Sequence, residues 1–323
     1  MSLAFVFPGQ GSQSVGMLSA LAKSSKVIEA TFAQASEVLG YDLWQRCQEG
    51  PAEALNATEC TQPAMLTAGV ATYRMWIERG GAVPRLMAGH SLGEFSALVA
   101  AGSLDFKTAV DLVKFRAEAM QAAVPQGQGA MAAILGLEDI DIEAACREAA
   151  QDEVVEAVNF NAPGQVVIAG TAAGVARAIE TAAAKGARRA VPLPVSVPAH
   201  SSLMLPAAER LRARLASVQL LPPSLSIAVY GVDVKRHTQP DEIRAALVKQ
   251  LHTPVYWAAT VRTLIAAGAT QIVECGPGKV LTSLNRRIDK NRDLKMLALE
   301  DNQAFGEALA ALQGDQMQSR TSC

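Results

Sequence analysis

The chain has 323 residues, 50% of them hydrophobic, which is enough for one large domain or two smaller domains with a substantial core. A formal net charge of −2 argues against a nucleic-acid-binding protein that relies on bulk positive charge, and no run approaches the roughly 20 apolar residues of a membrane span. The five cysteines are scattered and form no C-x-x-C pair, so we expect neither a disulfide framework nor a metal site. The first residues include no basic leader, so we expect a cytoplasmic protein without a signal peptide.

The first element is a short apolar run, Leu3 to Phe7, which predicts a buried strand. A loop follows over Pro8-Gly9-Gln10-Gly11-Ser12-Gln13. It lacks the third glycine of G-x-G-x-x-G, because Ser14 stands there, and no Gly-Lys-Ser/Thr follows. Both nucleotide-binding motifs therefore fail. Two interpretations remain: a structural turn, or a loop whose backbone approaches a substrate.

Residues 17 to 80 are predicted to be mostly helical. Val27 to Leu39 and Leu66 to Trp76 carry apolar residues at helical spacing. Thr61-Gln62-Pro63-Ala64 predicts the start of a helix, with proline near the first turn.

A Gly-X-Ser-X-Gly pattern, Gly89-His90-Ser91-Leu92-Gly93, follows an apolar run that ends at Leu86–Ala88 and precedes an Ala-rich helical pattern that begins at Ser96. A strand that turns sharply into a helix needs very small flanking residues. Such a bend holds Ser91 Oγ clear of the backbone at a helix N-terminus, where amide groups stabilise an oxyanion. The alternative is a glycine-rich turn with an ordinary serine. The strand before it and the helix after it favour a serine nucleophile.

Phe106 to Val124 predicts a further helix, which ends at the Pro/Gly-rich stretch Pro125 to Gly129. This helix contains Arg116 among apolar residues. Taken by itself, an arginine on a helix is a solvated or salt-bridged residue.

The pattern then changes to strand, helix, strand, strand, helix, strand within about 70 residues, the order of the ferredoxin-like unit. The predicted elements are Ala130–Leu137, Ile140–Ala150, Val154–Asn159, Gln165–Ala169, Gly174–Lys185 and Arg189–Val195. We therefore predict an α/β fold: an α/β-hydrolase-like large domain with a parallel sheet, and an inserted ferredoxin-like (βαββαβ) small domain. The predicted boundaries are 1–127 and 197–312 for the two parts of the large domain, 128–196 for the insertion and 313–323 for a disordered tail.

The returning part of the large domain alternates helices and strands. Its predicted elements are the helices Met204–Val218, Glu242–Leu251, Val255–Ala267 and Lys279–Arg287 and the strands Leu225–Val229 and Gln271–Glu274.

A serine nucleophile needs a base, and only four histidines exist. The side chain of His90 should point away from Ser91 across so sharp a turn. His237 lies in a charged stretch that predicts a solvated loop, and His252 looks like a helix-end residue. His200, after a proline-stiffened segment, is the candidate by elimination. The alternative is that His200 merely caps a helix.

Six stretches, in this order along the chain, carry a resemblance that runs from about residue 3 to residue 300. They are Phe5-Val6-Phe7-Pro8-Gly9-Gln10-Gly11-Ser12-Gln13, Thr61-Gln62-Pro63-Ala64, Gly89-His90-Ser91-Leu92-Gly93-Glu94, Asn159-Phe160-Asn161-Ala162-Pro163-Gly164-Gln165, Val195-Ser196-Val197-Pro198-Ala199-His200 and Glu274-Cys275-Gly276-Pro277-Gly278-Lys279. With these residues the chain closely resembles the malonyl-CoA:acyl carrier protein transacylases of bacterial fatty-acid synthesis.

The resemblance implies acyl transfer in two half-reactions. Ser91 would attack the malonyl thioester of coenzyme A while His200 takes its proton, and the phosphopantetheine thiol of acyl carrier protein would then attack the malonyl-serine. The oxyanion donors would be the backbone N–H groups of Gln10 and Leu92, with Gly9 and Gly11 allowing close approach. No cofactor is implied.

The resemblance also implies how the partners of the serine are arranged. The main-chain carbonyl of Gln250 would orient the histidine. Arg116 would hold the free malonyl carboxylate as a bidentate pair, which an acetyl group cannot form. Gln62, Asn161 and Ser196 would line the pocket.

Two departures from the family pattern concern the pocket. Ala199 stands where many relatives have serine, and Tyr230-Gly231 stands where many have Asn-Asn. Neither removes a catalytic group.

The implied partners are acyl carrier protein and malonyl-CoA or coenzyme A, with no nucleic acid and no membrane, and a monomer is expected. Because the carrier protein is acidic, a basic face should meet it. The candidates are two groups, Lys185, Arg188 and Arg189 at the end of the insertion, and Lys279, Arg286, Arg287 and Lys290 around the late helix. Two ordinary solvated faces are the alternative.

Two other functions stay open on the residues alone. A serine hydrolase or thioesterase shares the same strand–turn–helix motif but does not need a buried Arg116 facing the acyl group. A non-catalytic scaffold for carrier proteins would bind the partner without forming a covalent adduct.

Overall fold

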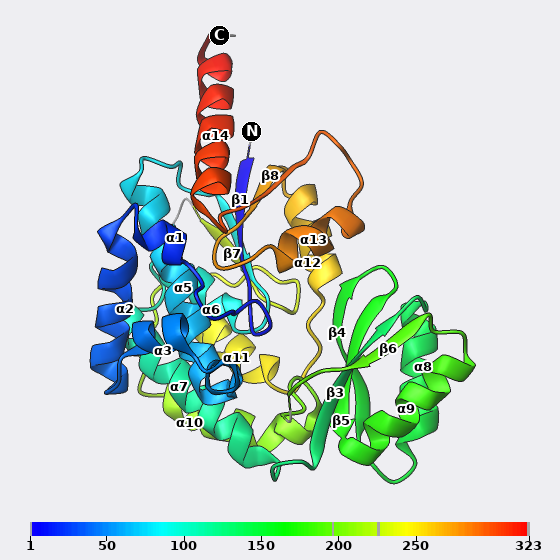
Figure 1. The fold of residues 1–323 in the computed structure, drawn as a ribbon. Helices are drawn as coiled ribbons and strands as arrows, with labels where there is room; N and C mark the ends of the chain where they lie inside the picture. The colour runs from blue at the N-terminus through cyan, green and yellow to red at the C-terminus, as the bar shows by residue number, and fades with distance from the viewer. Residues whose placement is uncertain (1, 196, 225–226, 322–323) are drawn as a thin grey trace.

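The computed structural model describes residues 2–195, 197–224 and 227–321. Figure 1 shows a larger α/β domain and, beside it, a smaller domain with its own sheet. Among the described residues, none of the helices has the length and apolar character needed to cross a membrane.

The large domain is built on a five-stranded sheet in the order β7-β2-β1-β8-β9, with every pairing parallel. Its strands are β1 (Ser2–Phe7), β2 (Leu86–Gly89), β7 (Ala228–Tyr230), β8 (Ala269–Glu274) and β9 (Lys295–Ala298). Residues Leu3 to Phe7 of the central strand β1 are all buried, because helices cover both faces of a parallel sheet.

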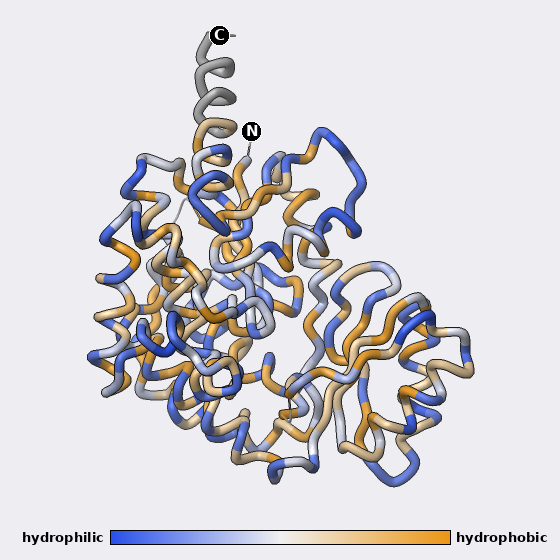
Figure 2. The backbone as a smooth tube through the Cα atoms, viewed as in Figure 1, coloured by the Kyte–Doolittle hydropathy of each residue, from blue (hydrophilic) through white to orange (hydrophobic). Residues whose placement is uncertain are grey.

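Alternate residues of β1 enter two different cores, as the period of two in a strand requires. Leu3, Phe5 and Phe7 belong to the larger hydrophobic cluster with the helices of the first half of the chain. Ala4 and Val6 belong to a second cluster with residues of two late helices. In Figure 2 the apolar residues gather in and around the sheet, and polar residues mark the outer loops.

The helices of the large domain occupy both faces of this sheet. They are α1 (Ser19–Ala22), α2 (Lys26–Leu39), α3 (Leu43–Glu49), α4 (Ala52–Asn56), α5 (Thr58–Glu78), α6 (Gly93–Ala100), α7 (Phe106–Ala123), the short 3₁₀ helix η1 (Ser202–Met204), α10 (Leu205–Leu215), α11 (Pro240–Gln250), α12 (Trp257–Ala266), α13 (Val280–Ile288) and α14 (Asn302–Thr321).

The small domain has an antiparallel sheet in the order β4-β5-β3-β6, and α8 and α9 cover it with a core of their own. Its elements are β3 (Gly129–Leu135), α8 (Asp139–Ala150), β4 (Val155–Ala162), β5 (Gln165–Thr171), α9 (Ala172–Ala184) and β6 (Arg189–Pro192). The predicted fold class, a parallel α/β domain with a βαββαβ insertion, is confirmed. The residue boundaries of the two domains stay predictions.

Backbone hydrogen bonds join the small sheet to the large domain. Val255, just before α12, donates its N–H to the carbonyl of Val158, and Phe160 donates to the carbonyl of Val255, at 2.8 and 2.9 Å. The middle of β4 is therefore held against the segment that leads into α12, and Ala162, at the end of β4, packs into a core cluster of the large domain.

Two predicted elements differ in their bounds from the structure. The helix predicted to start at Thr61 begins one turn earlier, at Thr58, and Pro63 lies inside α5. The hydroxyl of Thr61 donates to the carbonyl of Leu55 at 2.6 Å, which ties the first turn to α4, and the missing N–H of Pro63 removes one bond of the ladder. The strand predicted over Leu225–Val229 is observed at Ala228–Tyr230, and its first two residues lie outside the described part.

The C-terminal helix α14 extends to Thr321, and the last two residues lie outside the described part. The run from Asn302 is rich in alanine, leucine and glutamine, which all favour helix. The disordered tail expected over 313–323 stays a prediction, as do the other domain boundaries.

Candidate active site

The Gly-X-Ser-X-Gly segment forms a tight turn between β2 and α6. A Cβ on Gly89 would lie 1.9 Å from the carbonyl carbon of Gly93, and a Cβ on Gly93 would lie 2.0 Å from the carbonyl oxygen of Phe7. Only glycine fits these two close approaches. Ser91, at the apex, has a φ of 51°, a conformation that L-residues rarely adopt. The sharp bend predicted from the glycines is therefore present, and it places the Ser91 hydroxyl at the start of α6.

His200 lies next to Ser91, although 109 positions separate them in the chain. Ser91 Oγ and His200 Nε2 are 2.7 Å apart, and His200 Nδ1 is 2.7 Å from the main-chain oxygen of Gln250. Because a carbonyl oxygen only accepts, Nδ1 carries the proton and donates it to Gln250, which leaves the Nε2 lone pair facing the serine. The structure thus brings together the serine, histidine and carbonyl group that the sequence proposed.

Arg116, on α7, is 2% exposed, which excludes the solvated position that an arginine on a helix would take by default. Its Nη1 donates to Gln62 Oε1 at 2.7 Å, and its Nη2 donates to Gln250 Oε1 at 3.0 Å and to Ser91 Oγ at 3.3 Å. Arg116 Nε has no acceptor among the described residues. A buried guanidinium group with hydrogen-bonding capacity left beside the serine is suited to bind an anion.

Burial changes the acid–base properties of these groups. Burial and, to a smaller degree, the Arg116 charge lower the pKa of His200 to about 3. Burial lowers the pKa of Arg116 to about 10, which Glu94 partly opposes, so the guanidinium group is charged at neutral pH. His200 is consequently neutral near pH 7 and is in the form that accepts a proton.

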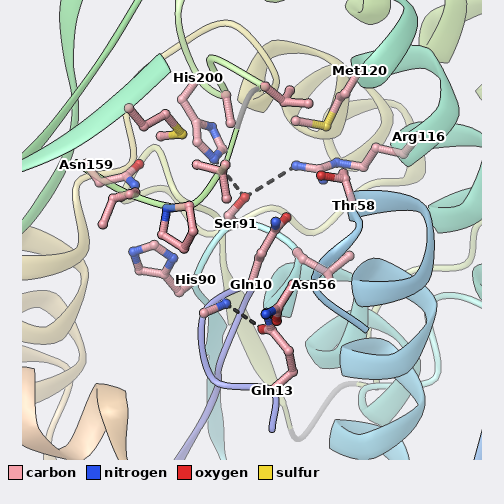
Figure 3. A pocket seen from close by; sticks show the side chains of 18 residues that line it. Gln10, Gln13, Asn56, Thr58, His90, Ser91, Arg116, Met120, Asn159 and His200 are labelled. Atoms are coloured by element: carbon pink, nitrogen blue, oxygen red, sulfur yellow. Dashed lines mark hydrogen bonds between the residues drawn. The ribbon is translucent and has the colours of Figure 1, made fainter. Parts of the chain in front are cut away.

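A cavity of about 390 Å³ opens onto Ser91 and His200. Figure 3 shows the serine at its centre, with His200 and Arg116 directed toward it from different elements. The lining comes from both domains: Gln10, Gly11, Gln13, Asn56, Thr58, His90, Ser91, Leu92, Arg116, Met120, Met131, Asn159, Leu193, Pro194, Val195, Val197, Ala199 and His200. The lining is mostly apolar, and its polar groups converge on the serine.

The two predicted oxyanion donors, the amides of Gln10 and Leu92, belong to residues that line this cavity. Neither amide donates to a protein acceptor within the described ranges. A Cβ on Gly9 would lie 2.4 Å from the carbonyl oxygen of His90, so the loop approaches the turn as closely as predicted. Gly11 has open space around it, and its φ of +106° is the reason for glycine there.

Two of the three residues predicted to line the pocket, Gln62 and Asn161, are not part of its lining. Each instead contacts a residue that does line the cavity. Gln62 Oε1 accepts from Arg116 Nη1, and Asn161 Oδ1 lies 2.8 Å from His90 Nε2. Ser196 lies outside the described residues. His90, expected to point away from Ser91, lines the same cavity, because its bond to Asn161 turns the ring toward the small domain.

Several residues of the site were missed as functional candidates. Asn56, Thr58 and Met131 line the cavity, and Asn159 contributes a buried side-chain oxygen without a partner in the described chain. Glu94, in the first turn of α6, is buried and accepts from Gln250. An acidic residue three positions after the serine in the strongly apolar start of a helix was the available signal.

The remaining histidines lie apart from the serine. His237 Nε2 pairs with Asp233 Oδ1 at 3.0 Å and is partly buried rather than fully solvated, and His252 follows the end of α11, as predicted. Within residues 2–195, 197–224 and 227–321, no group of three or more His, Cys, Asp or Glu side chains is arranged to hold a metal ion.

Comparison with known proteins assigns the family. The model of the acyl transferase domain matches residues 4–301. The malonyl CoA-acyl carrier protein transacylase of Escherichia coli (strain K12) is 55% identical over 306 residues, which are 95% of this chain and 98% of that protein. The chain belongs to the malonyl-CoA:acyl carrier protein transacylase family.

Solved structures of this transacylase family agree with the observed fold. An acyl carrier protein S-malonyltransferase from Vibrio cholerae superposes with a TM-score of 0.91 at 52% identity, covering 95% of this chain and 100% of that one. A malonyl-transacylase solved in complex with a type II polyketide acyl carrier protein superposes with a TM-score of 0.93 at 51% identity, covering 96% and 100%. The protein is therefore an acyltransferase.

The two departures from the transacylase pattern lie in different places. Ala199 lines the cavity next to His200, so it affects the room available to an acyl group. Tyr230 and Gly231 do not line the cavity; a Cβ on Gly231 would lie 3.1 Å from Glu94 Oε1.

Proposed function

We propose that the protein transfers the malonyl group of malonyl-CoA to the phosphopantetheine thiol of acyl carrier protein through a malonyl-serine intermediate, and so supplies fatty-acid elongation. The observation that carries this proposal is the buried Arg116 guanidinium group 3.3 Å from the nucleophilic oxygen of Ser91. An acyl group that ends in a carboxylate can neutralise this charge, and an acyl group without one cannot.

In the first half-reaction Ser91 Oγ attacks the thioester carbonyl carbon while His200 Nε2 takes the hydroxyl proton across 2.7 Å. The carbonyl oxygen becomes an oxyanion, which the unpaired amides of Gln10 and Leu92 stabilise. The C–S bond then breaks, the proton on His200 passes to the departing sulfur, and coenzyme A leaves as a thiol. The Gln250 carbonyl oxygen keeps the imidazole in the required orientation throughout.

The second half-reaction repeats these steps in the reverse sense. The phosphopantetheine thiol gives its proton to His200 Nε2 and attacks the carbonyl carbon of the malonyl-serine. The C–O bond to Ser91 breaks, and the proton returns to the serine oxygen. The cycle regenerates the enzyme and needs no cofactor and no metal.

The partner and setting are part of the proposal. A relative is known in complex with an acyl carrier protein, which supports such a partner here. Of the basic residues expected to meet it, Lys185 pairs with Glu148 and Lys279 pairs with Glu300. We propose a cytoplasmic monomer that uses no nucleic acid and no membrane.

The test is the intact mass of the protein after mixing with malonyl-CoA. A malonyl adduct that forms on the wild type and is absent from Ser91→Ala supports the proposal. The matched control is Ser96→Ala, which removes a buried hydroxyl from α6, the helix that follows Ser91, outside the cavity lining, and should keep the adduct.

Addition of carrier protein bearing phosphopantetheine should then move the mass increment from the enzyme to the carrier. Steady release of free malonate without carrier would identify a hydrolase instead. Binding of the carrier with no adduct on either protein would identify a non-catalytic scaffold. Either result contradicts the proposed transfer.

A further inference from the structure

Glu94 is a buried carboxyl group for which the proposed reaction has no role. It lies in the first turn of α6, three residues after Ser91, and is 3% exposed. It does not line the active-site cavity, so it does not meet the substrate. A carboxyl group this far from water is costly unless hydrogen bonds satisfy it, so its partners show what it does.

Two donors converge on one oxygen of Glu94. Gln250 Nε2 donates to Glu94 Oε2 at 2.7 Å, and the main-chain N–H of Val232 donates to the same atom at 3.2 Å. Gln250 Nε2 also donates to the main-chain oxygen of Ser91 at 3.2 Å. Both hydrogens of the Gln250 amide are therefore used, and both point away from Arg116.

This arrangement determines which end of the Gln250 amide faces Arg116. An ionised carboxylate only accepts hydrogen bonds, so it binds the NH₂ end of an amide and turns the oxygen end away. Gln250 Oε1 consequently faces Arg116 Nη2 and accepts from it at 3.0 Å. The reversed amide would place an oxygen against the carboxylate and an NH₂ group against the guanidinium group, which is unfavourable at both ends.

The link between Glu94 and Arg116 is indirect, and this matters for the proposed substrate. In the part of the chain that the structure describes, the three hydrogen bonds of Arg116 go to neutral groups of Gln62, Ser91 and Gln250. The Glu94 charge favours the charged guanidinium group, but through the intervening amide and not as a direct pair. The guanidinium group is held in place and its charge stays available to an incoming carboxylate.

We propose that Glu94 is a positioning residue for acyl selectivity: it fixes the orientation of the Gln250 amide, which holds the Arg116 guanidinium group in the position where it meets the carboxylate of the acyl group on Ser91. This inference rests on the proposed malonyl transfer. It predicts that a change at Glu94 lowers malonyl transfer more than acetyl transfer, although Glu94 touches neither acyl group.

The test compares the rates at which malonyl-CoA and acetyl-CoA acylate Ser91, measured by intact mass. It is done at about pH 8, because burial raises the pKa of Glu94 to about 7 and the carboxyl group is mostly ionised above that pH. Glu94→Gln keeps the shape and one acceptor, but two amides can pair in either orientation. Glu94→Ala removes the acceptor. The matched control is Glu274→Gln, another buried carboxyl group, which accepts from the main-chain N–H groups of Leu281 and Thr282 at the start of α13.

We expect the malonyl-to-acetyl rate ratio to fall about threefold in Glu94→Gln and about tenfold in Glu94→Ala, the tenfold change corresponding to loss of a single hydrogen bond to a charged group. Glu274→Gln should keep the wild-type ratio. An unchanged ratio in folded Glu94→Gln overturns the inference, as does an equal loss of both rates in Glu94→Ala.

The wild type separates this inference from the proposal on which it rests. A wild-type protein that forms no malonyl adduct refutes the proposed function itself. A wild-type protein that forms the adduct, together with a Glu94→Gln variant that keeps its selectivity, refutes only the role of Glu94.

Discussion

Replacement of Arg116 by alanine tests how the cavity recognises an acyl group. The guanidinium group is 2% exposed and would form two charge-assisted hydrogen bonds to a malonyl carboxylate. Two such bonds, each worth about 1.5–3 kcal/mol, predict a loss of about 3 kcal/mol or more, roughly 100-fold in kcat/KM for malonyl-CoA. Acetyl-CoA has no carboxylate, so its reaction does not use these two bonds. For acetyl-CoA the variant lacks only the hydrogen bonds of Arg116 to Ser91 Oγ, at 3.3 Å, and to Gln62 and Gln250. For acetyl-CoA we expect a loss of at most about tenfold.

The assay measures adduct formation and carrier acylation with both thioesters for the wild type, Arg116→Ala and Arg116→Lys. Lysine keeps the charge but not the two-pronged geometry, so it should recover part of the malonyl rate. The matched control is Arg74→Ala: Arg74, on α5, donates to Thr31 and Gln34 away from the serine, and its loss should leave the rate ratio unchanged. Equal losses for malonyl and acetyl in Arg116→Ala would refute the reasoning.

The remaining predictions concern the base His200, the loop that carries Gln10, and the pH dependence of stability. His200→Ala should slow acylation by about 10²–10⁴-fold with little change in the melting temperature. The control His252→Ala should keep the wild-type rate. Stopped-flow acylation and thermal melts measure the two quantities. Gln13 accepts from the N–H of Gly11 and donates to Asn56, and so holds the loop that carries the Gln10 amide. Because this amide would stabilise the oxyanion of either acyl group, Gln13→Ala should lower malonyl and acetyl transfer equally. A change in the ratio of the two rates would contradict that role. Burial raises the pKa of Glu274 from 4.5 to about 7, so the folded protein binds this proton more tightly than the unfolded chain does. The free energy of unfolding therefore falls as pH rises from about 4.5 to about 7. Relative to Glu274→Gln, the wild type should lose on the order of 3 kcal/mol of unfolding free energy across that range, and urea titrations that show no such trend would contradict it.

The sequence predicts best where a local rule decides the structure. The glycines at 89 and 93 predict the turn at Ser91 because no larger residue fits there, and the structure shows the close contacts that exclude a side chain. The βαββαβ order of the small domain follows from alternating apolar patterns whose length and period distinguish strand from helix. The resemblance of six separated motifs then pointed to the family, which the comparisons confirm.

The differences arise where tertiary contacts compete with local preference. Pro63 usually marks a helix start, but the hydroxyl of Thr61 bonds back to the preceding helix and α5 begins one turn earlier. His90 was expected to point away from Ser91, and its Nε2 indeed lies 2.8 Å from Asn161 Oδ1 of the small domain. The sequence did not indicate that the ring also lines the cavity, because that depends on this contact between the two domains.

The amino-acid sequence by itself therefore determined most of the strands and helices, the serine turn and a short list of candidate bases, since these depend on residues near one another in the chain. Only the tertiary structure decided that Arg116 is buried beside Ser91 and that Glu94, Gln250 and Arg116 form a connected hydrogen-bonded series. The reason is physical: burial and the orientation of an amide depend on partners up to 159 positions away, and no local pattern records them.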